Sequence, residues 1–171
     1  MQFEVSEQQR KRAKIPHEIF LINLVAVHIL WFVAALGIAK SLPQPIIAMP
    51  IMSASILIYI LWRAKKALQD DEDWFVKCHW QMAAKRARVF IGMLSLLVIV
   101  SALGWVGYTY LGMMQIAVMA LIGGAGILPI MVTVLGLIIM ESDSMHQASQ
   151  GKLGKAIVEK FPNPGLKVLE E

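Results

Sequence analysis

The 171-residue sequence has few charged residues, and none of them lies in the centre of a long apolar run. Only 16% of the residues are charged, whereas 57% are hydrophobic and the mean hydropathy is +0.62. Soluble domains are about 45–50% apolar, and they scatter charge along every helix. The missing charge therefore excludes an ordinary soluble domain and indicates a protein embedded in lipid.

Cysteine is almost absent, since Cys78 is the only one. A single thiol cannot form an internal disulfide, and the CxxC spacing of zinc and redox sites does not occur. Phosphate-binding, zinc-protease and serine-hydrolase motifs are missing as well. We therefore expect no catalytic residue and no metal site, and an enzyme is the less favoured answer. The net charge of +4 is assigned to cytoplasmic loops, so no nucleic-acid partner is expected.

Four apolar runs are long enough to cross a bilayer, at about residues 19–38, 46–62, 89–111 and 113–140. A spanning helix needs roughly 17–25 residues. None of the runs alternates apolar and polar residues as a barrel strand does, and lipid cannot hydrogen-bond an open backbone. The sequence therefore predicts an all-α polytopic membrane protein with four transmembrane helices in two antiparallel hairpins.

Positive charge is distributed unevenly between the two sides of this arrangement. Of the 16 Lys and Arg residues, four lie in residues 1–17, seven in the link 63–88 and four in the tail 141–171, which leaves only Lys40 for the other side. The positive-inside rule places the charge-rich side in the cytoplasm. We therefore predict a multi-pass protein of the inner (plasma) membrane with both termini cytoplasmic.

The link 63–88 contains an acidic run at residues 70–73, followed by a periodic stretch and then by basic residues. Acidic residues favour the N-terminal end of a helix and basic residues its C-terminal end. The pattern predicts a cytoplasmic amphipathic helix at the membrane surface that continues into the third span. In the tail, the sequence predicts a short helix around residues 152–160.

His28 is the one ionisable residue near the middle of a predicted span. Ionisable groups at this depth are costly and usually face the protein interior. A neutral imidazole hydrogen-bonded within the bundle, for instance to Asn23, is the favoured interpretation. Haem ligation, quinone binding and proton transfer by His28 remain open, although no cofactor is expected. Because His17, His79 and His146 fall outside the spans, one chain is not expected to supply two histidines to a haem.

Small residues gather in the fourth span ahead of a proline. Small residues let helices approach closely in lipid, and proline kinks a helix. The segment is predicted to be a packing surface with a kink, and a hinge that lines an ion path stays open; its residues are Gly123, Gly124, Gly126 and Pro129. Aromatic and basic side chains near the span ends are predicted to anchor the chain at the lipid interface: Trp62, Arg63, Trp74, Trp105 and Tyr108.

Three functions are compatible with this pattern. The preferred one is a non-catalytic accessory or structural subunit of a larger inner-membrane complex, because catalytic residues are lacking and two polar cytoplasmic segments are available for docking. Its expected partners are lipid and other membrane subunits, or further copies of itself. The alternatives are a haem- or quinone-associated redox protein that uses His28, and a small homo-oligomeric channel or carrier.

Overall fold

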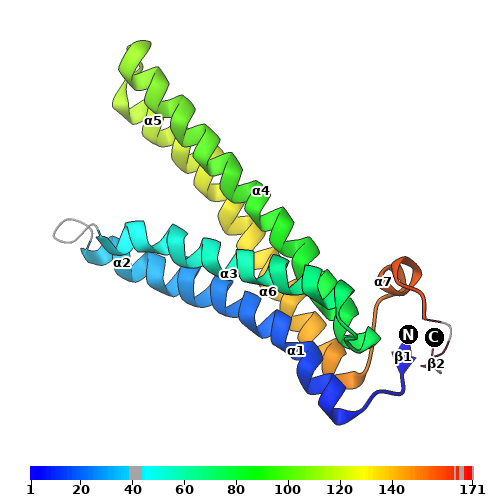
Figure 1. The fold of residues 1–171 in the computed structure, drawn as a ribbon. Helices are drawn as coiled ribbons and strands as arrows, with labels where there is room; N and C mark the ends of the chain where they lie inside the picture. The colour runs from blue at the N-terminus through cyan, green and yellow to red at the C-terminus, as the bar shows by residue number, and fades with distance from the viewer. Residues whose placement is uncertain (39–43, 164, 166–167, 171) are drawn as a thin grey trace. The chain divides into compact units, whose positions relative to one another are not determined.

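The computed structural model of this chain is dominated by helices (Figure 1). It describes residues 1–38, 44–163, 165 and 168–170. Two segments, η1 and η2, are wider π-helices that continue the neighbouring α-helices without a break. In chain order the elements are β1 (Gln2–Phe3), α1 (Glu7–Ile22), η1 (Asn23–Trp31), α2 (Phe32–Ile38), α3 (Gln44–Gln69), α4 (Trp74–Tyr110), α5 (Gln115–Leu121), η2 (Ile122–Ile127), α6 (Leu128–Gln150), α7 (Lys155–Lys160) and β2 (Val168–Glu170).

Three continuous helical stretches are long and apolar enough to cross a membrane. They are Glu7–Ile38, Trp74–Tyr110 and Gln115–Gln150. To this extent the prediction of a helical, multi-pass membrane protein is confirmed. The predicted second span, 46–62, lies inside α3, which is not among these three stretches.

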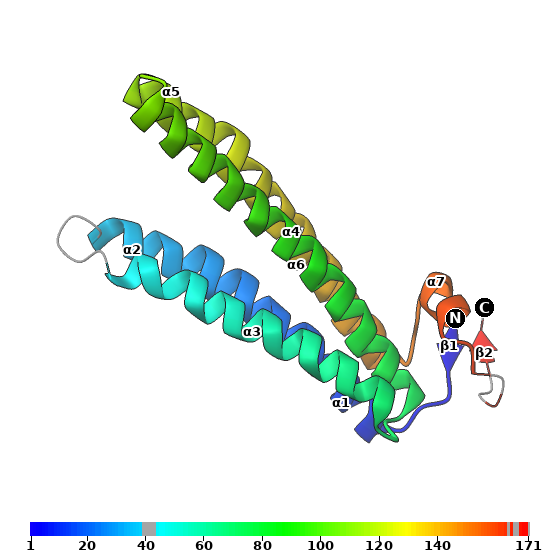
Figure 2. The same cartoon turned by 45° about the horizontal axis from the view of Figure 1, so that its top comes forward.

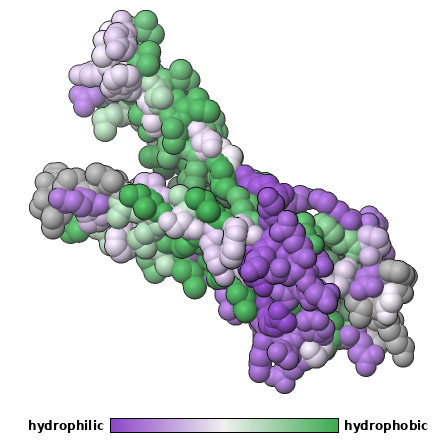
Figure 3. Space-filling model, in the orientation of Figure 1, coloured by the Kyte–Doolittle hydropathy of each residue, from purple (hydrophilic) through white to green (hydrophobic). Residues whose placement is uncertain are grey.

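The chain divides into two compact units, which are Met1–Ala87 with Ile138–Glu171, and Arg88–Leu137. In the first unit, α3 runs back along α1, η1 and α2 (Figures 1 and 2). Apolar side chains fill the space between these helices; among the most buried are Phe20, Leu24, Leu57, Ile60 and Phe75. Figure 3 shows hydrophilic residues gathered at the end of this unit that holds the termini.

The start of α1 is fixed by a capping box. The Ser6 hydroxyl accepts from the backbone N–H of Gln9 at 3.2 Å, and the Gln9 side chain accepts from the Ser6 N–H at 2.8 Å. Two backbone donors that a helix N-terminus leaves without partners are thereby satisfied. The helix consequently begins 12 residues before the predicted first span.

The N-terminal strand binds the C-terminal part of the chain. β1 pairs with β2 in antiparallel orientation, and the Phe3 N–H donates to the Gly151 carbonyl at 2.9 Å. The Leu153 N–H donates to the Met1 carbonyl at 3.0 Å. The predicted short helix of the tail is present as α7.

The second unit is a helical hairpin in which α4 lies beside α5, η2 and the beginning of α6 (Figures 1 and 2). Its turn contains Gly112, whose φ of 65° suits a residue without a Cβ atom. The Met113 N–H donates back to the Gly107 carbonyl at 3.1 Å, which closes the turn. The helices approach closely at Gly126, where an added Cβ atom would lie 2.7 Å from Leu97 Cδ1.

The predicted link 63–88 is largely helical. α3 continues to Gln69 and α4 begins at Trp74, so residues 70–73 alone connect the two helices. The predicted amphipathic helix is the first part of α4, and it does continue into the third run. Its apolar face is buried within the protein, including Val76 and Trp80, because α4 packs this face against other helices. Residues 39–43, in the predicted turn between the first two spans, lie outside the described residues.

Candidate functional site

Four ionisable side chains from three helices meet inside the first unit. His17 belongs to α1, His79 and Arg86 belong to α4, and Glu141 belongs to α6. The two histidines and the glutamate are 0% exposed, and the Arg86 side chain is 15% exposed. We call these four residues the buried cluster.

The cluster is a continuous chain of hydrogen bonds. His17 Nδ1 lies 2.5 Å from Glu141 Oε2, and His17 Nε2 lies 2.9 Å from His79 Nδ1. Arg86 Nη1 donates to Glu141 Oε1 at 3.0 Å, to Ser144 Oγ at 2.8 Å and to the Met140 carbonyl at 3.0 Å. Each Glu141 oxygen therefore has a donor, as a buried carboxylate requires.

The local sequence places these groups on matching helix faces. His79 and Arg86 are seven residues apart, which brings them to the same side of α4. The alanines at 83, 84 and 87 are 0% exposed, and their small side chains let the neighbouring helices approach this face. On α6, Glu141 and Ser144 are three residues apart and hence adjacent on one face.

Arg86 keeps its charge inside a protein, so Glu141, which accepts from it, is held as a carboxylate. His79 precedes the apolar run that starts at Val89. Its burial, together with the nearby His17 and Arg86, lowers the pKa of His79 from 6.5 to about 3. His79 is therefore neutral at physiological pH, and its ring also packs edge-on against Phe75.

A second ionic group surrounds the short connection between α3 and α4. Glu72, whose side chain is 4% exposed, pairs with Arg12 of α1 and with Arg63 of α3. Arg12 also reaches Asp73 at 3.2 Å. Ion pairs thus tie this acidic connection to both α1 and α3. Arg63 was predicted to be an interfacial anchor. Its Nη2 donates to Glu72 Oε2 at 2.6 Å, and its guanidinium group lies over the Trp80 ring.

His28 is buried, with 5% of its surface exposed. Its Nδ1 lies 3.0 Å from the carbonyl oxygen of Asn23, and since a carbonyl only accepts, Nδ1 carries the proton. The two residues are five apart in η1, where the wider π-helical turn aligns them. His28 is thus hydrogen-bonded to the backbone of Asn23, within its own helix; a bond to a neighbouring helix stays a prediction.

The predicted packing residues of the fourth span fall into two groups. Gly126 contacts α4 at Leu97, whereas an added Cβ atom at Gly123 or Gly124 meets no atom within 4 Å. Pro129 lies in the first turn of α6, directly after the π-helical η2. Two of the three glycines thus leave an open surface on the helix.

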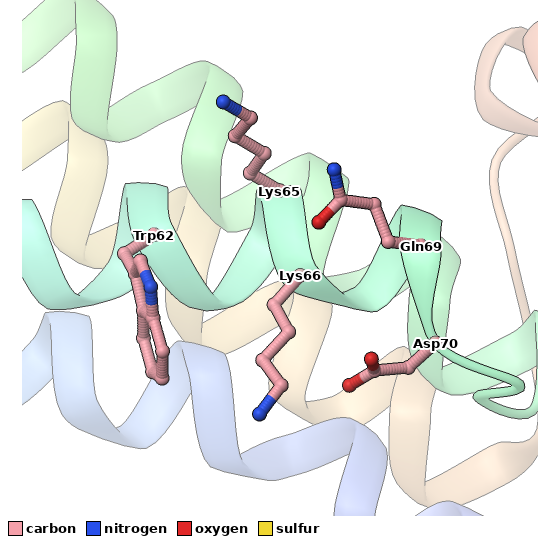
Figure 4. Close-up of a pocket in the computed structure, with 5 residues that line it drawn as sticks. All are labelled: Trp62, Lys65, Lys66, Gln69 and Asp70. Carbon is pink, nitrogen blue, oxygen red and sulfur yellow. The ribbon is translucent and has the colours of Figure 1, made fainter.

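The predicted anchors differ in their surroundings. Trp62 is 55% exposed and borders a surface pocket on α3 with Lys65, Lys66, Gln69 and Asp70 (Figure 4). Lys66 Nζ lies 5.4 Å from the centre of the Trp62 ring.

The remaining anchors lie on α4. The Trp74 indole donates to the Phe161 carbonyl at 2.7 Å and packs edge-on against Phe3. This side chain therefore has its hydrogen bond inside the protein. Trp105 and Tyr108 are both more than half exposed.

The buried cluster was not anticipated from the sequence. Its members lie 62 and 124 residues apart along the chain, in segments that looked like polar flanks. The available signal was the seven-residue spacing of His79 and Arg86, together with a lone Glu141 directly after the fourth run. Among the described residues, no group of three or more His, Cys, Asp or Glu side chains is arranged to hold a metal ion.

Comparison of this chain with protein-family models, with curated proteins and with solved structures finds no match.

Proposed function

We propose that this chain is a non-catalytic, four-span protein of the inner membrane that serves as an accessory or structural subunit of a larger complex. In this proposal α3 spans the membrane in addition to the three stretches named above, as the predicted second span. Its 26 residues extend about 39 Å at 1.5 Å per residue. Its residues Ile51 and Ile58 are 64% and 65% exposed. Exposed apolar side chains along a helix of this length suit a lipid surface.

A shared side of the membrane for both termini is supported by the pairing of β1 with β2, because paired strands must lie on the same side. The excess of Lys and Arg on that side favours the cytoplasm. The pocket beside Trp62 adds to this support (Figure 4). An indole followed by Lys65 and Lys66 is the arrangement expected where a helix leaves the bilayer into an anionic headgroup layer.

One observation carries the subunit proposal: the ionisable groups of the buried cluster are enclosed within the chain, while small-residue helix surface lies open. His17, His79 and Glu141 are sealed from solvent in the buried cluster. Gly123 and Gly124, in contrast, have open space beside them. In lipid, helices associate through close packing at such small residues, so this surface suits a neighbouring transmembrane helix.

Co-purification from native membranes in mild detergent, after brief crosslinking, tests the proposal. We expect a defined partner protein that is retained by the wild-type chain and lost with Gly124→Leu. The matched control is Gly37→Leu, which also fills open space beside a helical glycine and should retain the partner. A stable chain that purifies alone, with or without crosslinking, would contradict the subunit function.

The redox alternative is favoured by one specific feature of His28. Its Nδ1 proton is bound by the Asn23 carbonyl, which makes Nε2 the lone-pair nitrogen. Histidines that ligate metals usually donate their second N–H in this way. A visible absorption spectrum and bound-quinone analysis of the purified protein test this alternative. Absence of a haem band, and quinone content unchanged by His28→Ala, would exclude it.

A further inference from the structure

The protons of the buried cluster can be assigned from its donors and acceptors. Arg86 keeps its positive charge and donates to Glu141 Oε1, and a cation at this distance favours the carboxylate form of Glu141, which can only accept. His17 Nδ1, 2.5 Å from Glu141 Oε2, must therefore carry a proton. One proton remains to be placed. It lies between His17 Nε2 and His79 Nδ1, which are 2.9 Å apart, and either nitrogen can carry it.

Two arrangements satisfy that shared hydrogen bond. In the first, His79 Nδ1 carries the proton and donates it to His17 Nε2, and both rings are neutral. In the second, His17 Nε2 carries the proton and donates it to His79 Nδ1. His17 is then an imidazolium, and a neutral His79 holds its own proton on Nε2. The second arrangement contains one proton more than the first.

We propose that His17 and His79 form a two-imidazole proton relay that binds one proton. The proton bonds to His79 Nε2, and the N–H bond at His79 Nδ1 breaks as a new N–H bond forms at His17 Nε2. Positive charge thus ends on His17, beside the Glu141 carboxylate, while His79 remains neutral before and after. Loss of the proton follows the same steps in reverse.

The surroundings of the two rings favour charge on His17. The charged groups that contact the pair are Glu141 of α6, which touches His17, and Arg86 of α4, which binds the opposite carboxylate oxygen. His79 has no carboxylate partner and packs against Phe75. An imidazolium is therefore stabilised at His17 and disfavoured at His79.

The entry atom of the relay is visible in the structure. His79 Nε2 is buried and has no hydrogen-bond partner among the residues that the structure describes. Buried polar atoms are nearly always satisfied, so such an atom calls for an explanation. In the proposed relay it is the one ring nitrogen of the pair that is left to take up the additional proton. The relay lies wholly within the first unit and does not depend on the proposed subunit function.

Nitrogen-15 NMR of histidine-labelled protein in detergent tests the relay directly, because bare and protonated ring nitrogens have distinct shifts. On acidification we expect His17 Nε2 to become protonated while the His79 proton moves from Nδ1 to Nε2. Both changes should share one midpoint. A His79 tautomer that stays constant across the titration, or a His79 ring that itself becomes charged before unfolding, would overturn the proposal. The variants His146→Asn, at an exposed residue, and His28→Ala assign the signals, because they remove the other two histidines of the chain.

The variant Glu141→Gln provides a second, independent test of the relay. The amide can still accept from His17 Nδ1 but carries no charge, so the shared midpoint of the two coupled changes should move to lower pH. Asp143→Asn is the matched control, because Asp143 is exposed on the same helix, and it should leave the midpoint unchanged. Equal midpoints for wild type and Glu141→Gln would also overturn the relay.

Discussion

Removing Arg86 should destabilise the chain far more than removing any surface arginine. Arg86→Met keeps the length of the side chain but deletes the cation that binds Glu141 Oε1 at 3.0 Å. Glu141 is 0% exposed, so water cannot replace the lost donor. The variant would hold a buried carboxylate whose remaining partner is His17.

The expected loss follows from the cost of an uncompensated buried charge. Breaking a buried ion pair by removing one partner costs about 3–5 kcal/mol. The lost hydrogen bonds to Ser144 and to the Met140 carbonyl act in the same direction. Because a typical domain is stable by about 5–15 kcal/mol, we expect a clear fall in the midpoint of unfolding.

Unfolding in detergent micelles, followed by circular dichroism, measures this effect. Arg88→Met is the matched control, since Arg88 is exposed, and it should change the free energy of unfolding by less than about 0.5 kcal/mol. The double variant Arg86→Met with Glu141→Gln removes both charges. Its loss of stability should be smaller than the sum of the two single losses by about 2 kcal/mol or more. Arg86→Met within about 1 kcal/mol of the Arg88→Met control, or a double variant at the additive value, would refute the reasoning.

Three further predictions concern other parts of the chain. Cys78 precedes the third run, and burial raises the pKa of its thiol to about 12. At pH 8 only about one thiol in ten thousand is ionised, so maleimide labelling should be much slower in the folded protein than after unfolding in SDS, and equal rates would contradict the burial. Glu72→Gln should lower the free energy of unfolding by about 1–3 kcal/mol because Glu72 is buried between Arg12 and Arg63, whereas Glu7→Gln, at an exposed pair with Lys11, should cost less than about 0.5 kcal/mol. Gly126→Ala should be less stable than Gly124→Ala by about 1 kcal/mol in thermal unfolding, since the new methyl group at 126 displaces Leu97 Cδ1 whereas the one at 124 meets no atom within 4 Å, and equal stabilities would contradict the close approach.

The apolar helices could be predicted from the sequence because lipid demands long uncharged runs that no other structure supplies. The helix that starts after the acidic run was predicted for a similar reason, as charge at helix ends acts locally. The ends of the helices were harder to predict. α1 begins at Glu7 and α6 continues to Gln150, because tertiary contacts stabilise helix well beyond the apolar runs.

The buried cluster depended on contacts that no local pattern encodes. His17 and Glu141 lie at the polar edges of two apolar runs, where ionisable residues normally face water. Their burial requires that His79 and Arg86 lie on the same face of α4. It also requires the small side chains of three buried alanines on α4, which let the neighbouring helices approach. Each residue is ordinary in its own segment, and only the packing of α1, α4 and α6 makes the set unusual. His28, in contrast, could be singled out because an imidazole within an apolar run stands out by itself.

The pairing of β1 has a consequence for how the chain matures. The backbone partners of Met1 and Phe3 are Leu153 and Gly151, which the ribosome adds only after all the long helices. During synthesis the first five residues consequently have no strand to pair with, and they remain accessible to processing enzymes and chaperones. Closure of the N-terminal strand is thus a late event that reports completion of the helical part.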